Sequence, residues 1–226
     1  MLIRARQLLV EDGLVDDGWV LVVGESIVDW GVGAPGDRVD VEAGVPGDSV
    51  DGIFAVDGIY PADGIFSADG IVSPGFVDVH CHGGGGANFG ADADEVETVL
   101  ATHLAHGTTT MVASTVTGTI DDLCAQVAVL GGFVADGRLA GIHLEGPWLA
   151  PSYKGAHDES LLVAPQIADI ARLVAASGGA IRMVTIAPEL PGALAAIEYL
   201  KGLGVVSAIG HTGADLALTR SAIAAG

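Results

Sequence analysis

The chain reads HLEGPW from His143 to Trp148, and this stretch decides the fold class. An apolar run leads into it and ends in a carboxylate, Glu145, which a Gly-Pro pair follows at once. Such a run, closed by a turn signal, is typical of a strand with both faces buried in a parallel sheet. A loop then carries His157, twelve residues after Glu145. The stretch therefore predicts a buried strand with polar chemistry at its carboxyl end.

The same arrangement of a strand followed by a helix repeats along the second part of the chain. Repeated βα units with right-handed crossovers form either a doubly wound sheet or a (β/α)8 barrel. The TIM-like barrel is favoured, because candidate ligands stand at the carboxyl ends of the first, third and fifth strands, and the glycines at 83–86 lack the spacing of a nucleotide-binding turn. Five units are too few to close eight strands, so the barrel is predicted to be incomplete. The predicted strands cover 71–82, 108–115, 139–145, 180–187 and 204–210, and the predicted helices cover 94–106, 120–135, 165–176, 193–203 and 214–225.

Residues 1–70 have a different rhythm and predict a small β domain, which leaves 71–226 for the barrel. Strands at 2–10 and 19–23 are separated by Asp-Gly turns. Asp-Gly-Ile then recurs with a six-residue period within 51–70, beginning at Asp51, Asp57, Asp63 and Asp69. We interpret these hexads as a loop-like insertion between strands, and a short coil of hexad strands is the alternative.

The composition excludes several classes of partner. Nine Lys and Arg against 29 Asp and Glu give a formal net charge of −20, which disfavours nucleic acid and anionic membrane surfaces. Two cysteines, Cys81 and Cys124, form no disulfide framework and indicate a reduced, cytoplasmic setting. The first ten residues contain no signal-peptide core, and no apolar run approaches the ~20 residues of a membrane span.

A histidine pair, His80 and His82, ends the first predicted barrel strand. Residues two apart in a strand project from the same face, about 7 Å from each other, so this pair can hold one divalent ion. Asp78 shares that face and is predicted to orient a histidine by accepting a hydrogen bond. Cys81 points to the opposite face, where we expect it to belong to the core.

Glu145 and His211 stand at the ends of the third and fifth predicted strands. A lone carboxylate at a strand end is ordinarily a solvated rim residue, but the Gly-Pro pair and the apolar neighbours of Glu145 argue against that role. His143 lies deeper on the same face, and we expect a hydrogen-bonded core histidine there. Imidazole and carboxylate ligands together suit Zn²⁺, with Mn²⁺, Fe²⁺ or Co²⁺ as substitutes.

Other polar residues carry weaker signals. His103 and His106 are three apart on a predicted helix, and the position of His106 beside a helix end indicates that it satisfies end carbonyls. Ser114 and Thr115 have no neighbouring base and no Gly-x-Ser-x-Gly elbow around them. Trp148 is either a pocket wall or a buried aromatic residue at the barrel rim.

Three segments together resemble the N-acetylglucosamine-6-phosphate deacetylases of the amidohydrolase superfamily. They are VSPGFVDVHCHG from Val72 to Gly83, HLEGPW, and GHT from Gly210 to Thr212. The resemblance covers nearly the whole chain and implies an amidohydrolase barrel with a small N-terminal domain of the β-sandwich type. It implies four metal ligands and two substrate-binding positions, with the His157 side chain at the amide carbonyl and the Ala156 backbone lining the sugar pocket. The implied metal ligands are His80, His82, Glu145 and His211.

The implied activity is hydrolysis of the acetamido group of N-acetylglucosamine 6-phosphate, with a homodimer as the whole protein. In the family, the proton-transferring aspartate and a further metal-binding histidine lie on later strands, which would place them beyond Gly226. A polypeptide of these 226 residues is therefore expected to be inactive alone and poorly soluble. Two alternatives stay open, another amidohydrolase acting on cyclic or acyl amides and a non-catalytic protein on the same scaffold.

Overall fold

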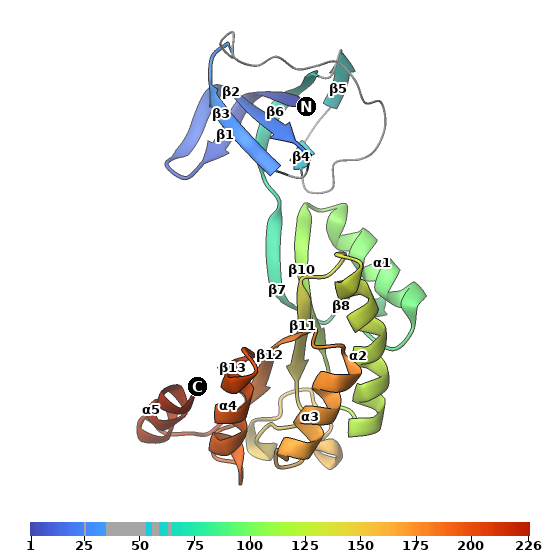
Figure 1. Ribbon diagram of the computed structural model, residues 1–226, viewed down its shortest axis with the longest axis vertical. Coiled ribbons are helices and arrows are strands. Elements are labelled where there is room, and N and C mark those ends of the chain that lie inside the picture. Colours follow the sequence, from blue (N-terminus) through green and yellow to red (C-terminus); the bar gives the residue numbers. More distant parts are fainter. Residues whose placement is uncertain (25, 35–52, 56–58, 63–64) are drawn as a thin grey trace. The chain divides into compact units, whose positions relative to one another are not determined.

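The computed structural model describes residues 1–24, 26–34, 53–55, 59–62 and 65–226 (Figure 1). The chain forms two compact units, Met1–Phe76 and Val77–Gly226. Within the described residues, no helix is both long and apolar enough to cross a lipid bilayer.

The first unit is a β-sheet domain. Its sheet has the strand order β3-β2-β1-β6-β4, and β5 also pairs with β6. Strand β1 pairs antiparallel with β2 and parallel with β6, and its apolar side chains pack in a small core with residues of both neighbours. The strands are β1 (Leu2–Val10), β2 (Gly13–Val23), β3 (Ser26–Val32), β4 (Ile53–Ala55), β5 (Ile59–Ala62) and β6 (Ile65–Pro74).

The Asp-Gly-Ile hexads differ from the expected loop-like insertion. Their described parts are strands, because β4, β5 and the start of β6 each begin at an isoleucine of the repeat. Both β4 and β5 pair antiparallel with β6. Isoleucine and aromatic residues favour the extended chain, and this preference exceeds the turn tendency of Asp-Gly here. The remaining residues of the repeat lie outside the described part of the chain.

The second unit contains a five-stranded sheet in the order β13-β12-β11-β10-β7, so neighbours in sequence are neighbours in space. Strands β10 to β13 pair in parallel, which confirms the predicted α/β class and a partial TIM barrel. A short hairpin of β8 (Gly83–Gly84) and β9 (Ala87–Asn88) follows β7. The sheet strands are β7 (Phe76–Cys81), β10 (Thr108–Thr115), β11 (Gly141–Glu145), β12 (Ile181–Ile186) and β13 (Val206–Ile209).

Helices follow these strands and bury a shared core against the sheet. Side chains of Asp92, Thr119 and Asp215 accept hydrogen bonds from the first turns of three helices, which fixes where those helices begin. Fully buried residues such as Leu123 of α2 and Ile142 of β11 join the layers. The helices are α1 (Ala93–Leu104), α2 (Ile120–Ala135), α3 (Ile167–Ala176), α4 (Ala193–Gly202) and α5 (Leu216–Ala225), close to the predicted bounds.

The predicted strand at 71–82 is wrong in its extent. The structure divides it into β6, which ends at Pro74, and β7, which begins at Phe76. Residues up to Pro74 pair within the sheet of the first unit, where Val72 is buried. Proline has no backbone N–H to continue a ladder of hydrogen bonds, and Gly75 permits the break that follows.

Candidate metal centre

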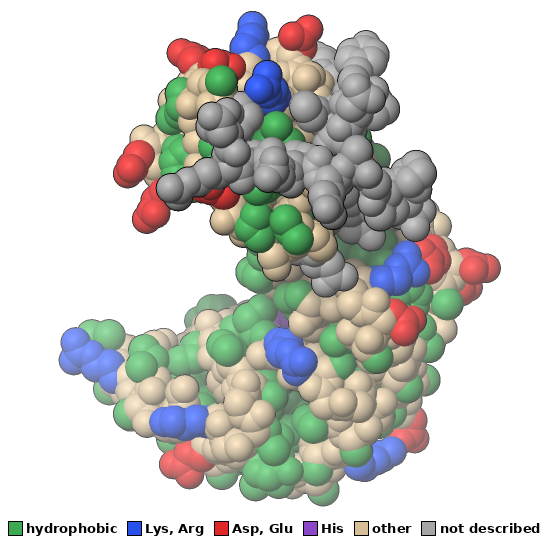
Figure 2. All heavy atoms as spheres, turned by 45° about the horizontal axis from the view of Figure 1, so that its top comes forward, with side chains coloured by type: hydrophobic (Ala, Val, Ile, Leu, Met, Phe, Trp, Pro, Cys, Tyr) green, Lys and Arg blue, Asp and Glu red, His purple; other side chains and the backbone are tan. Residues whose placement is uncertain are grey.

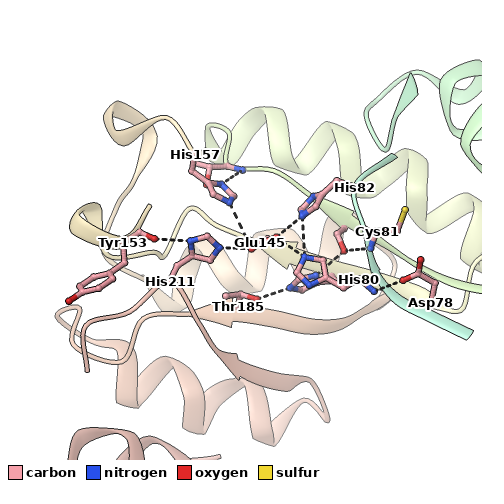
Figure 3. Close-up of polar contacts among 12 residues, drawn as sticks. Asp78, His80, Cys81, His82, Glu145, Tyr153, His157, Thr185 and His211 are labelled. Atoms are coloured by element: carbon pink, nitrogen blue, oxygen red, sulfur yellow. Dashed lines mark hydrogen bonds and ion pairs between the residues drawn. The ribbon is translucent and has the colours of Figure 1, made fainter. Parts of the chain in front are cut away.

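Polar side chains from several strands meet at the carboxyl end of the second unit's sheet (Figure 3). His80 lies on β7 and His82 directly after it, while Glu145 is the last residue of β11. His211 follows β13, and His157 lies on the loop after η1 (Pro151–Tyr153). The parallel strands place these residues at one edge, so groups far apart in sequence come together.

Glu145 stands between two sets of histidines. Its Oε2 lies 2.9 Å from Nε2 of His80 and 2.6 Å from Nε2 of His82. Its Oε1 lies 2.7 Å from Nε2 of His211 and 3.9 Å from Nε2 of His157. The hydrogen bond with His82, followed by those with His80 and His211, holds the pKa of the buried Glu145 carboxyl well below its usual range. The same bond raises the pKa of His82. Each oxygen of one carboxylate therefore faces its own group of imidazoles.

The donor set fits a divalent cation. Nε2 of His80 lies 3.1 Å from Nε2 of His82, and both nitrogens point at the same carboxylate oxygen. An ion bound among the two nitrogens and the carboxylate oxygen would be held by all three atoms at once, and imidazole with carboxylate is a zinc-type ligand set. Two ligand groups share Glu145, one with His80 and His82, the other with His157 and His211.

His211 is held in an unusual conformation that aims its ring. Its φ is 51°, in the left-handed region that non-glycine residues seldom occupy. The ring Nδ1 donates to the carbonyl oxygen of Tyr153 at 2.8 Å, and the His211 carbonyl accepts from the Ala150 N–H at 3.0 Å. Since a carbonyl can only accept, Nδ1 carries a proton, and Nε2 is the ring nitrogen that faces Glu145. With its proton on Nδ1, the neutral ring is the tautomer that a metal ligand requires.

His157 has the opposite tautomer. Its Nδ1 accepts from the backbone N–H of Thr117 at 3.4 Å and lies 2.7 Å from Thr117 Oγ1. Because Nδ1 accepts a hydrogen bond, the ring proton is on Nε2, and burial lowers the pKa of His157. That N–H points toward Glu145 Oε1. His157 is therefore placed as a hydrogen-bond donor to a group in the site. Ala156, the other predicted substrate position, lies exposed in the turn just before it, and its role stays a prediction.

His143 is the hydrogen-bonded core histidine that the sequence predicted. It is fully buried, with Nδ1 2.9 Å from Ser114 Oγ and Nε2 2.8 Å from Thr185 Oγ1. Burial lowers its pKa to about 4. Ser114 Oγ also accepts from the backbone N–H of Cys81. The Ser114–His143 pair thus links neighbouring strands inside the sheet unit, where the buried Ser114 hydroxyl is shielded from solvent.

Asp78 does not have the expected role. Its Oδ1 accepts from the backbone N–H of His80 at 3.0 Å, whereas the sequence predicted a bond to a histidine ring. A short aspartate side chain readily bonds to the backbone two residues ahead, and this local contact prevails.

Trp148 is fully buried in the core, which excludes the pocket-wall alternative. His106 Nδ1 donates to the Thr102 carbonyl near the end of α1, as predicted.

Comparison with known proteins agrees with this geometry. The family model described as "Amidohydrolase family" matches residues 71–223. The chain belongs to the amidohydrolase family.

Among solved relatives, N-acetyl-D-glucosamine-6-phosphate deacetylase from Mycobacterium smegmatis is 43% identical with a TM-score of 0.84, covering 100% of this chain and 54% of that one. A variant of it, in complex with N-acetyl-D-glucosamine-6-phosphate, has a TM-score of 0.83 at 43% identity and covers 100% of this chain and 53% of its own. N-acetylgalactosamine-6-phosphate deacetylase from Escherichia coli O157:H7 is 31% identical over 99% of this chain and 54% of the relative. The chain thus spans about half the length of these relatives.

Glu189 is a residue of this amidohydrolase that sequence reasoning missed. Its carboxylate accepts hydrogen bonds from the Thr212 hydroxyl and from the Gly213 N–H, the latter at 2.6 Å. Partial burial works to raise its pKa, but the bonds from Thr212 and Gly213 prevail and lower it. An ionised Glu189 therefore fixes the loop that follows His211. A solitary glutamate in a loop gave no sequence signal for this role.

Replacing Glu189 with alanine is expected to lower divalent-metal affinity by roughly 10- to 100-fold, because outer residues that orient a ligand have effects of this size. Competition between the protein and a chromophoric chelator measures the affinity. Glu198→Ala, at an exposed position of α4, is the matched control and should leave affinity unchanged. Equal affinities for the two variants would show that the loop needs no carboxylate.

Proposed function

We propose that the protein hydrolyses the acetamido group of N-acetylglucosamine 6-phosphate to glucosamine 6-phosphate and acetate, with a bound divalent ion, zinc in the first place. The observation that carries the proposal is Glu145 between the His80–His82 pair and His211, each nitrogen within 2.9 Å of a carboxylate oxygen. The 43% identity to the M. smegmatis deacetylase supports N-acetylglucosamine 6-phosphate as the substrate.

Each side chain of the site has its own role in the proposed amide hydrolysis. His80, His82, Glu145 and His211 would hold the ion, which when bound polarises the amide carbonyl and activates a water molecule. The His157 Nε2–H donates to the carbonyl oxygen and stabilises the negative charge that develops there. The water oxygen bonds to the carbonyl carbon, the C–N bond breaks, and the amine leaves with the proton that the water gives up. By the resemblance, an aspartate on a later strand carries that proton.

An anionic substrate needs a local group of basic side chains to bind its phosphate. The net charge of −20 repels an anionic substrate, and in the second unit the Lys and Arg side chains stand apart from one another on the face shown in Figure 2. The resemblance assigns the phosphate to Arg and His residues of later strands and of a second subunit. A homodimer in the cytoplasm is therefore included in the proposal.

The test begins with the intact mass of the purified polypeptide, which establishes what is assayed. The whole protein, stripped of metal and reloaded with zinc, should release equal amounts of acetate and free amine from N-acetylglucosamine 6-phosphate. N-acetylgalactosamine 6-phosphate and a cyclic amide serve as competing substrates. Preference for the cyclic amide would favour another amidohydrolase, and loss of all metal on dialysis would favour a non-catalytic protein. A polypeptide of residues 1–226 alone should bind metal without turnover.

A further inference from the structure

Strand β7 carries a second set of ligand-type groups near Cys81, whose side chain leaves the strand on the face opposite to His80 and His82. The Sγ of Cys81 lies 3.3 Å from Nε2 of His103 on α1 and 3.3 Å from the Gly83 carbonyl oxygen. The same His103 nitrogen lies 3.1 Å from that carbonyl oxygen. Cys81 is buried and His103 is half-buried. A sulfur, a nitrogen and an oxygen thus form a nearly equilateral triangle.

Hydrogen bonding alone leaves this triangle incomplete. The thiol offers one proton and the His103 Nε2 at most one, so two of the three contacts can be hydrogen bonds. If both groups donate to the Gly83 carbonyl, sulfur and nitrogen lie 3.3 Å apart with no proton between them. A cation at the centre would satisfy all three atoms at once.

The dimensions suit a small tetrahedral ion. Bonds of roughly 2.0 to 2.3 Å to nitrogen, oxygen and sulfur separate neighbouring ligands by about 3.3 to 3.8 Å. The observed separations of 3.1 and 3.3 Å need only a slight expansion to reach this range. A carboxylate oxygen of Asp78 lies within 4.8 Å of both the sulfur and the nitrogen, near enough to become the fourth ligand. Asp78 belongs to β7, an edge strand of the sheet, so its side chain has room to turn toward the site.

Gly84, next to Gly83 in the hairpin, leaves room for the His103 ring beside the Cys81 sulfur. A Cβ on Gly84 would lie 2.7 Å from Nε2 of His103. Any side chain there would press on the nitrogen that completes the triangle. The hairpin of β8 and β9 therefore presents bare backbone to the His103 ring.

We propose that Cys81, His103 and Asp78, with the Gly83 carbonyl, form a second metal site that binds a thiophilic divalent cation, Zn²⁺ or Cd²⁺. The site differs in chemistry from the Glu145 centre, whose side-chain ligands are nitrogen and oxygen only. Thiolate selects soft cations, whereas imidazole and carboxylate accept a wider range. An ion here would link α1 to β7 at Cys81, which lies between His80 and His82 of the Glu145 centre in the sequence. Its occupancy would stiffen the strand that carries them.

Cadmium provides a selective probe, because cadmium–thiolate bonds absorb in the ultraviolet and bonds to imidazole or carboxylate lack that band. The metal-free protein is titrated with Cd²⁺, and the band should rise to a plateau whose height corresponds to one thiolate-bound ion per chain. The chain has two cysteines, so Cys124→Ser is the matched control and should keep the band. Cys81→Ser should abolish it. His103→Asn and Asp78→Asn should weaken the affinity by roughly ten-fold or more.

Circular dichroism of each variant establishes that the fold is retained. Absence of the band in the unmodified protein, its survival in Cys81→Ser, or its loss in Cys124→Ser would each overturn the proposal. Unchanged affinity in both His103→Asn and Asp78→Asn would do the same. Glu145→Gln should keep the band, so the test of the Cys81 site is independent of the test of the proposed catalytic centre.

Discussion

Replacing Glu145 with glutamine is expected to reduce the affinity of the Glu145 centre for divalent metal by roughly 100-fold or more. This loss exceeds the roughly 10- to 100-fold effect of residues that only orient a metal ligand. Glu145 is the one carboxylate shared by both ligand groups around it. Glutamine keeps the size of the side chain but removes its charge. It also replaces one carboxylate oxygen, an acceptor, with an amide nitrogen, a donor. The His80–His82 pair and His211 would then face a neutral group.

Metal content after dialysis, measured by elemental analysis, and calorimetric titration report the loss. Ligand binding stabilises a fold in proportion to affinity and concentration, so the rise in melting temperature on adding zinc should shrink as well. Glu198→Gln on the exposed side of α4 is the control and should bind metal like the unmodified protein. Equal zinc content in Glu145→Gln and Glu198→Gln would rule out Glu145 as a ligand.

Replacing Gly146 with alanine is expected to lower the free energy of unfolding by about 2 to 4 kcal/mol, through a left-handed backbone and overpacking combined. Gly146 has a φ of 84°, and its added Cβ would lie 1.9 Å from Thr117 Oγ1 and 3.2 Å from Thr117 Cα. A hydroxyl can rotate away, but the backbone of Thr117 cannot. Since Thr117 holds the His157 ring, its displacement would also disturb the side of the centre that is proposed to contact substrate.

Denaturant unfolding measures the change in stability. Gly132→Ala is the matched control, because Gly132 lies within α2 and a Cβ there meets nothing within 4 Å. This control should be neutral or slightly stabilising, as alanine favours helix over glycine. A Gly146→Ala protein as stable as Gly132→Ala would mean that the loop can relax without cost.

Much of the second unit could be predicted because its signals are local and periodic. Apolar runs and intervening helices predicted the succession of strands and helices, with most boundaries within two residues and both ends of α2 correct. The first strand failed because apolar residues continue through Pro74 and Gly75, and hydropathy does not register a missing N–H. The prediction of a loop-like insertion at the Asp-Gly-Ile hexads was wrong because the turn tendency of Asp-Gly was given more weight than the strand preference of isoleucine.

The meeting of His80, His82, Glu145 and His211 follows from a general rule, that parallel strands end on one side of a sheet. Their roles as metal ligands, and those of His157 and Ala156 toward substrate, stay predictions. The tautomers could not be foreseen, because they depend on the Tyr153 carbonyl and on Thr117, which reach the histidines through loops.

The contacts of Glu145 with its three nearest histidines span 63 to 66 residues of sequence on either side. During synthesis at about 5 to 20 residues per second, roughly 6 to 26 seconds separate the emergence of His82 from that of His211. A nascent chain therefore displays His80 and His82, two of the four predicted metal ligands, well before His211 exists. Metal capture by the complete proposed centre would come late, after all the strands from β7 to β13 have been synthesised.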